Sequence, residues 1–193
     1  MKKDIILAGV GGQGILSIAT IIGEAALAEK LYIKQAEVHG MSQRGGDVQS
    51  NLRLSSKPIH SDLIARGGAD LVISLEPMEA LRYLPYLSQE GWIVTNSTPF
   101  INIENYPEAE ALYARLHQLP HVILLDVEKV AKEAGAPLQA ANMVLLGAAA
   151  PVLGLPFEKL EAGIRDIFAS KGEEVVEKNL TALRVGRANS IKL

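Results

Sequence analysis

Residues 4–14 read Asp-Ile-Ile-Leu-Ala-Gly-Val-Gly-Gly-Gln-Gly, so that an apolar run leads into a glycine-rich loop and then into a long apolar segment at 15–29. This order is typical of the first strand, phosphate-binding turn and first helix of a dinucleotide-type α/β fold. We expect Gly9 to permit the tight turn, Gly11 to let the backbone approach a ligand, and Gly14 to let the helix pack close to the strand. The N–H groups at the start of the helix would favour an anion such as a phosphate.

The rest of the chain alternates between strand and helix patterns. A strand is expected at residues 32–38, and short, continuous apolar runs predict three more at 71–75, 92–95 and 122–125. Because continuous runs are typical of strands covered on both faces, we expect a mainly parallel sheet between helices, with the second strand parallel to the first. Residues 48–55 alternate apolar and polar side chains, which predicts an added antiparallel edge strand with one wet face, or half of a hairpin continuing to Ile64. The predicted fold is α/β, a single Rossmann-like domain over residues 1–193.

Two helical segments are so apolar that something must cover them. The segment at 15–29 has only a narrow polar stripe, so we expect another chain or domain to cover its outer face. The stretch at 134–157 has no charged side chain and is long enough to cross a bilayer. Because prolines and glycines interrupt that stretch, we expect a buried helix from about Ala140 to Leu153 instead.

The composition excludes several classes of function. The chain has 193 residues, 48% of them hydrophobic, which is enough for a substantial core. The formal net charge is −3 and no basic cluster stands out, so nucleic acid is not an expected partner. The sequence has no cysteine, which excludes disulfides, thiolate nucleophiles and cysteine-ligated iron–sulfur clusters. The first apolar run is too short for a signal-peptide core, so we expect a cytoplasmic protein without membrane contact.

Ligands of open α/β sheets bind beyond the carboxyl ends of the strands, which directs attention to the loops that follow them. Glu37 comes 23 residues after Gly14, close to where a dinucleotide fold places the acid that binds ribose hydroxyls; it could equally cap the loop after it. The run Gln43-Arg44-Gly45-Gly46 could fold over a phosphate or carboxylate, or form an ordered loop at a subunit contact.

The sequence shows no complete active site of its own. It lacks a nucleophile elbow, a phosphate-loop lysine after the glycines and a close pair of carboxylates. Its four histidines do not share metal-ligand spacing, so we expect no metal site. These absences favour a chain that contributes part of a site.

Three segments identify a family resemblance when they are taken in order. They are Gly9-Val-Gly-Gly-Gln-Gly14, Glu37-Val-His-Gly-Met-Ser-Gln-Arg-Gly-Gly46 and Asn142-Met-Val-Leu-Leu-Gly-Ala148. Together they resemble the gamma-type subunit of 2-oxoacid:ferredoxin oxidoreductases, and the second is most similar to the beta subunit of indolepyruvate:ferredoxin oxidoreductase. The resemblance covers essentially the whole chain, and three ordered motifs are much more specific than a glycine loop alone.

The resemblance implies a subunit of an enzyme that oxidatively decarboxylates a 2-oxoacid, indolepyruvate or another arylpyruvate, to an acyl-coenzyme A and passes the electrons to ferredoxin. It implies that a larger alpha-type partner holds thiamine diphosphate, Mg²⁺ and the iron–sulfur clusters, and that this chain is inactive alone; the isolated chain could form a homodimer. As the catalytic residues of this chain, Gln43 and Arg44 would reach toward the shared cleft, and coenzyme A is the expected cosubstrate. The expected binding residues are Gly9, Gly11, Gly12, Gln13, Gly14, Glu37, Gly45, Gly46 and Asn96.

Two other functions stay open from the sequence. The glycine fingerprint with Glu37 also fits a stand-alone NAD(P)-dependent reductase, although no Tyr-x-x-x-Lys pair or comparable proton donor accompanies it. The nearly all-apolar first helix would suit a noncatalytic assembly subunit whose glycine loop serves only packing.

Overall fold

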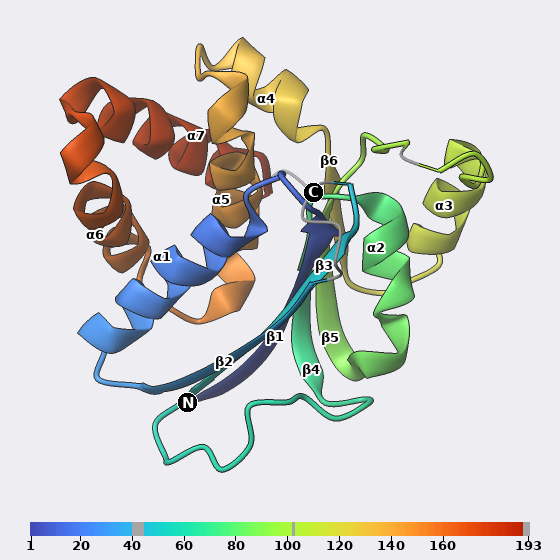
Figure 1. Cartoon of the computed structure of the whole chain (residues 1–193), viewed down its shortest axis with the longest axis horizontal. Coiled ribbons are helices and arrows are strands. Elements are labelled where there is room, and N and C mark those ends of the chain that lie inside the picture. The colour runs from blue at the N-terminus through green and yellow to red at the C-terminus, as the bar shows by residue number, and fades with distance from the viewer. Residues whose placement is uncertain (40–44, 102, 191–193) are drawn as a thin grey trace.

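The structure is a computed structural model that describes residues 1–39, 45–101 and 103–190, and Figure 1 shows one sheet with helices on both of its faces. The strands are β1 (Lys2–Val10), β2 (Tyr32–His39), β3 (Asp47–Ser55), β4 (Ala69–Ser74), β5 (Leu87–Asn96) and β6 (Val122–Leu125). The helices are α1 (Ile15–Ala28), α2 (Pro77–Arg82), α3 (Ala109–Leu116), α4 (Val127–Glu133), α5 (Ala141–Leu153), α6 (Phe157–Phe168) and α7 (Glu173–Ser190). Short 3₁₀ turns lie at Leu84–Tyr86, Leu138–Ala140 and Ala169–Lys171.

The strand order in the sheet is β2-β3-β1-β4-β5-β6. The strands β1, β4, β5 and β6 pair in parallel, whereas β3 is antiparallel to β1 on one side and to β2 on the other. The predicted α/β class, a mainly parallel sheet with an antiparallel hairpin at its edge, is confirmed. The strand predicted at 48–55 is present as β3, but its predicted place at the edge of the sheet is wrong. β3 is paired along both sides, and β2 is the edge strand. Its hairpin partner is β2 and not a segment running to Ile64.

Successive residues of β1 show how the sheet divides the interior into two layers. Ile5 and Leu7 enter the larger core, together with α1, α4, α5, α6 and α7, while Ile6 and Ala8 enter the smaller core with α2 and α3. None of these four side chains is exposed. A strand places successive side chains on opposite faces, so this continuous apolar run fits a sheet that is covered on both sides.

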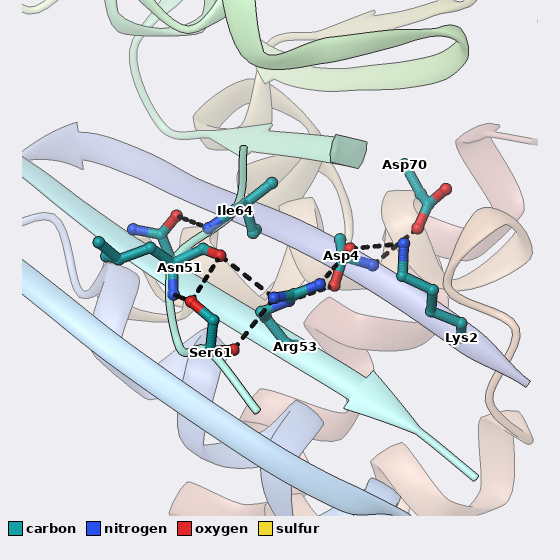
Figure 2. Close-up of polar contacts among 8 residues, drawn as sticks. Lys2, Asp4, Asn51, Arg53, Ser61, Ile64 and Asp70 are labelled. Atoms are coloured by element: carbon teal, nitrogen blue, oxygen red, sulfur yellow. Dashed lines mark hydrogen bonds and ion pairs between the residues drawn. The ribbon is translucent and has the colours of Figure 1, made fainter. Parts of the chain in front are cut away.

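The face of β3 that was expected to be wet is covered by the loop at 56–68. Figure 2 shows the Arg53 guanidinium donating to both carboxylate oxygens of Asp4, at 2.7 and 3.0 Å, and to the main-chain oxygen of Ser61 at 3.0 Å. Oδ1 of Asn51 accepts from the N–H of Ile64 at 3.2 Å. The polar residues of the alternating pattern therefore hold a loop in place, and the prediction of a wet face is wrong.

Part of the outer face of α1 is covered by α6 of the same chain. Gly163 of α6 lies so close to α1 that a Cβ at that position would be 3.3 Å from the main-chain oxygen of Ile21. Leu16 and Leu27 of α1 stay 43% and 58% exposed, so the expectation that another chain or domain covers the rest of this face stays a prediction. The uncharged stretch forms α5, whose residues are almost all buried, as predicted from its prolines and glycines. No helix in the described ranges has the length and apolar character needed to cross a membrane.

Candidate functional site

The glycine loop joins β1 to α1 at the carboxyl edge of the sheet. Gly12 and Gly14 have φ angles of 103° and 81°, which side chains rarely adopt, so both positions favour glycine. Gly9 does not make the tight turn that was predicted: it lies within β1, and a Cβ there would be 2.9 Å from Oε1 of Gln13. At Gly14 the close neighbour is α5 and not the strand, because a Cβ would be 2.7 Å from Nδ2 of Asn142.

Gly11 links this loop to the turn that precedes β3. Its N–H donates to the oxygen of Gly46 at 2.8 Å, and its own oxygen accepts from the N–H of Gly45 at 3.4 Å. These contacts engage both main-chain polar groups of Gly11 within the protein, so an approach of this backbone to a ligand stays a prediction. Gln43 and Arg44 lie outside the described residues, and Gly45, which follows them, lies against the glycine loop.

Two amide side chains predicted to bind a ligand are hydrogen-bonded to the main chain. Oε1 of Gln13 accepts from the N–H of Val10 at 2.7 Å, and its Nε2 donates to the oxygen of Leu75 at 3.2 Å. Nδ2 of Asn96 donates to that same oxygen at 3.4 Å, and its Oδ1 accepts from the N–H of Val127 at 3.2 Å. Gln13 and Asn96 therefore brace the ends of β1, β4, β5 and β6 against one another.

A cavity of about 650 Å³ opens at this edge of the sheet, between the glycine loop, α5 and the last two helices. Of the predicted binding residues, it is lined by Gly12, Gln13, Gly14 and Asn96. The cavity adds polar residues that were not predicted as binding residues: Ser17, Glu128, Gln139, Asn142, Lys171, Lys178 and Asn179. This volume lies within the range typical of small-molecule sites.

Asn142 is the most informative side chain in this wall. It is 9% exposed, and its Nδ2 donates to the main-chain oxygen of Gly14 at 3.1 Å across 128 residues of sequence. Its Oδ1 has no hydrogen-bond partner among the residues that the structure describes. Because buried polar atoms in native proteins almost always have a partner, this oxygen is an exception, and it belongs to a residue that lines the cavity.

The charge in the cavity favours an anion. The lysines at 171 and 178 line it, and Glu128 is the carboxylate among the described lining residues. Nζ of Lys178 lies 2.5 Å from Oε1 of Glu174, an exposed side chain, and the ammonium of Lys171 lies 5.3 Å from the centre of the Phe168 ring. Exposed contacts of this kind are weak, so an anionic ligand could compete for both ammonium groups.

Sequence reasoning could have found only part of this wall. Asn142 opens the third motif of the family resemblance, and this was its only signal. Lys171 and Lys178 had no signal in the sequence. They lie more than 150 residues from the glycine loop and reach it only through the packing of α6 and α7.

Glu37 is not brought to the cavity. It lies on the edge strand β2, separated from β1 by β3, and its Oε1 accepts from Nε2 of Gln35 at 2.7 Å. Glu37 is also not among the described residues that line the cavity. A ribose contact by this carboxylate stays a prediction that the described geometry does not support.

Glu76 is a completely buried carboxylate just after β4. Burial raises its pKa, although hydrogen bonds from the Tyr106 hydroxyl and from the N–H groups of Glu79 and Phe100 act in the opposite direction. The carboxylate caps the N-terminus of α2 and holds Phe100 and Tyr106, which follow β5, close to it. Its role in the described structure is therefore to position these two residues, at the edge of the sheet that carries the cavity.

Comparison with known proteins identifies the relatives of the chain. Residues 4–189 match the pyruvate ferredoxin/flavodoxin oxidoreductase family. The sequence is 36% identical over 200 residues to indolepyruvate oxidoreductase subunit IorB of Archaeoglobus fulgidus, covering 99% of this chain and 96% of that protein. It is 30% identical over 186 residues to the common gamma subunit of the pyruvate/ketoisovalerate oxidoreductases of Pyrococcus abyssi, covering 94% and 93%.

Solved structures share the fold. Pyruvate oxidoreductase subunit PORC of Thermotoga maritima aligns with a TM-score of 0.74 at 22% identity, covering 97% of this chain and 96% of that one. A 2-oxoglutarate:ferredoxin oxidoreductase of Magnetococcus marinus, solved with 2-oxoglutarate, coenzyme A and succinyl-CoA bound, aligns with a TM-score of 0.77 at 23% identity. This chain is covered completely in the second alignment but spans 31% of that longer chain.

Proposed function

The chain belongs to the pyruvate ferredoxin/flavodoxin oxidoreductase family, and from that premise we propose that it is the gamma-type subunit of a 2-oxoacid:ferredoxin oxidoreductase. We take residues 1–193 as one such domain. The proposed substrate is indolepyruvate or another arylpyruvate, which is oxidatively decarboxylated to an acyl-coenzyme A. The similarity to indolepyruvate oxidoreductase subunits over nearly the whole length of both chains supports this substrate class.

A larger alpha-type subunit is the proposed partner, and ferredoxin is reached through the assembled complex. That subunit would hold thiamine diphosphate, Mg²⁺ and the iron–sulfur clusters. The composition supports this division, because a chain without cysteine cannot supply thiolate ligands to a cluster. The cytoplasm is the proposed location.

The single observation that carries a binding role for this chain is the cavity beside the glycine loop. It combines Lys171, Lys178 and the buried Oδ1 of Asn142, which lacks a partner among the described residues. These groups fit coenzyme A, because its phosphates are anionic and its amide and amino groups can donate hydrogen bonds. When bound, coenzyme A supplies the thiol that accepts the acyl group.

Within this site each part of the chain has a defined task. Gly12 and Gly14 of the glycine loop would bind phosphate through their main-chain N–H groups, with the lysines supplying positive charge from α7 and the turn before it. Gln13 and Asn96 would act by holding the loop and the strand ends in place. Gln43 and Arg44 are proposed to face the partner's cleft, which the contact of Gly45 and Gly46 with Gly11 supports.

Co-expression with the larger subunit tests the proposed function. We expect the purified complex to reduce a dye or ferredoxin when it is given an arylpyruvate and coenzyme A, and each chain alone to be inactive. NAD(P)H-dependent reduction of an oxoacid by this chain alone would establish the reductase instead. A complex whose activity is unchanged when this chain is left out would establish a noncatalytic assembly role.

Coenzyme A binding is tested separately by titration calorimetry on the assembled complex. Lys178→Gln should weaken binding by roughly tenfold, because it removes a charge-assisted contact to phosphate. Lys57→Gln is the matched control, since Lys57 follows β3 at the opposite edge of the sheet. If the two variants bind coenzyme A with equal affinity, the cavity is not part of the coenzyme A site.

A further inference from the structure

A second hollow adjoins the glycine loop, and nothing described so far accounts for it. Its volume is about 410 Å³, and its described walls are the loop glycines, the first turn of α1 and the facing ends of β1 and β3. The side chains that line it are all aliphatic: Val10, Ile15, Leu16 and Val48. No charged or hydrogen-bonding side chain is among the described lining residues, so this hollow differs in chemistry from the lysine-bearing cavity.

The two spaces share part of their walls. Gly12 and Gly14 line both of them. Because neither glycine carries a side chain, only backbone separates the lysine-bearing cavity from the aliphatic hollow at these two positions. An elongated ligand with an anionic end and an apolar end could therefore lie across the loop and contact both spaces.

Leu16 gives the hollow its exposed apolar surface. Its side chain is 43% exposed although it stands on the first turn of α1, while the neighbouring Ile15 and Val48 are 3% and 9% exposed. Covering this exposed aliphatic side chain with an apolar group of a ligand would be favourable, because it removes apolar surface from water.

We propose that this hollow binds the aromatic acyl end of the acyl-coenzyme A thioester while its phosphates occupy the lysine-bearing cavity. This inference rests on the proposed function, which supplies an arylacyl-coenzyme A as the product. The hollow would then let the gamma-type subunit hold an arylacyl thioester more tightly than acetyl-coenzyme A, because a short acetyl group leaves the aliphatic walls uncovered. Leu16 is the residue that we expect to set this preference.

The test measures dissociation constants of three ligands on the assembled complex: coenzyme A, acetyl-coenzyme A and phenylacetyl-coenzyme A. We expect phenylacetyl-coenzyme A to bind roughly tenfold more tightly than acetyl-coenzyme A, in keeping with the burial of an aromatic ring against aliphatic walls. Leu16→Asn should reduce this ratio to within about twofold and leave the affinity for coenzyme A unchanged. Leu16 is exposed and sits in the first helical turn, where asparagine is tolerated, so the variant should fold.

Leu27→Asn is the matched control, because Leu27 is an exposed leucine of the same helix, 58% exposed, that does not line the hollow. It should keep the full preference for the aromatic thioester. Equal affinities of the two thioesters for the unmodified complex would overturn the inference, as would a Leu16→Asn variant that weakens all three ligands equally, since the hollow would then hold the pantetheine arm. If coenzyme A itself does not bind, the proposed coenzyme A site is wrong. If coenzyme A binds but the two thioesters bind equally, only the proposed site for the acyl group is wrong.

Discussion

Gly147 of α5 and Gly186 of α7 lie where the two helices cross with their backbones in contact. A Cβ on Gly147 would be 1.9 Å from the main-chain oxygen of Leu183, and a Cβ on Gly186 would be 2.0 Å from that of Val144. Both distances are far below any tolerated contact, and the obstructing atoms belong to backbone that cannot swing aside. This crossing fixes α7, and with it Lys178, relative to the start of α5, where Asn142 contacts the glycine loop.

Gly147→Ala should therefore destabilise the chain by about 3 kcal/mol or more, because the added methyl group must push two buried helices apart. Gly186→Ala should act in the same direction. Urea unfolding followed by circular dichroism measures both effects. Gly23→Ala is the control, since Gly23 is a helical glycine whose Cβ would meet nothing within 4 Å, and it should raise stability by about 0.5 to 1 kcal/mol. Equal effects of all three changes would contradict the close crossing.

Asn142→Leu should separate binding from stability. The substitution removes the Oδ1 atom that lacks a partner among the described residues, and also the bond from Nδ2 to Gly14, whose oxygen still accepts from the N–H of Ser17 at 3.2 Å. Removing an unsatisfied buried atom offsets the loss of one hydrogen bond, so stability should change by less than about 1 kcal/mol. Affinity for coenzyme A should fall about fivefold or more.

The control for this substitution is Asn189→Leu, which removes a bond from Nδ2 to the oxygen of Val185 within α7, away from the described cavity wall. It should leave coenzyme A binding unchanged. A loss of stability by Asn142→Leu as large as its loss of binding would show that Asn142 serves the fold alone.

Asp4 should stabilise the folded chain at neutral pH, and this contribution should be lost in acid. Burial raises the pKa of its carboxyl, but hydrogen bonds and charges from Arg53 and Lys2 outweigh burial and hold that pKa below its usual value. A carboxyl whose pKa is lowered in the folded state contributes stability above its unfolded pKa of 3.8, and that contribution is lost as the pH falls through the folded value. Asp4→Asn should cost about 3 kcal/mol at pH 7, since it leaves the Arg53 guanidinium without its carboxylate partner.

The measurement is the free energy of unfolding between pH 3 and pH 8 for both proteins. The difference between them should shrink as the pH falls below about 4, because the unfolded chain then takes up a proton at Asp4 that the folded chain, with its lower pKa, does not. A difference that stays constant across this range would show that Arg53 does not depend on the charge of Asp4.

Tyr106→Phe should destabilise the chain most at neutral and alkaline pH. Burial already raises the pKa of Glu76, and the Tyr106 hydroxyl is one of the donors that favour its ionised form. A carboxyl with a raised pKa contributes stability that is present below its unfolded pKa of 4.5 and lost as the pH rises through the folded value. Removing the hydroxyl raises that pKa further, so the loss, about 1.5 to 3 kcal/mol at pH 8, should be smaller at pH 4.

Tyr113→Phe is the matched control for this pH dependence, because the Tyr113 hydroxyl donates to the neutral main-chain oxygen of Ser97 at 2.7 Å. Its effect on stability should be similar at pH 4 and pH 8. If Tyr106→Phe behaves in the same way, the hydroxyl does not stabilise the charged form of Glu76.

The sequence predicted the parts of the fold that depend on local pattern. The glycine loop between an apolar strand and an apolar helix was found as expected, and the short run at 122–125 matches β6 residue for residue. The predicted helix from about Ala140 to Leu153 corresponds to α5. Periodicity, glycine and proline report whether a segment is strand or helix and how many of its faces are buried, and that information is present in each short segment by itself.

Neighbours in space were decided only by the tertiary structure. The alternation at 48–55 indicated a strand but could not tell that β3 lies between β2 and β1, nor that the loop at 56–68 covers its polar face, because a polar side chain that faces water and one that holds a loop look alike in sequence. The cavity shows the same limit. Lys171 and Lys178 reach the glycine loop only because α6 and α7 fold back over α1 and α5, and such long-range packing leaves no local trace in the chain.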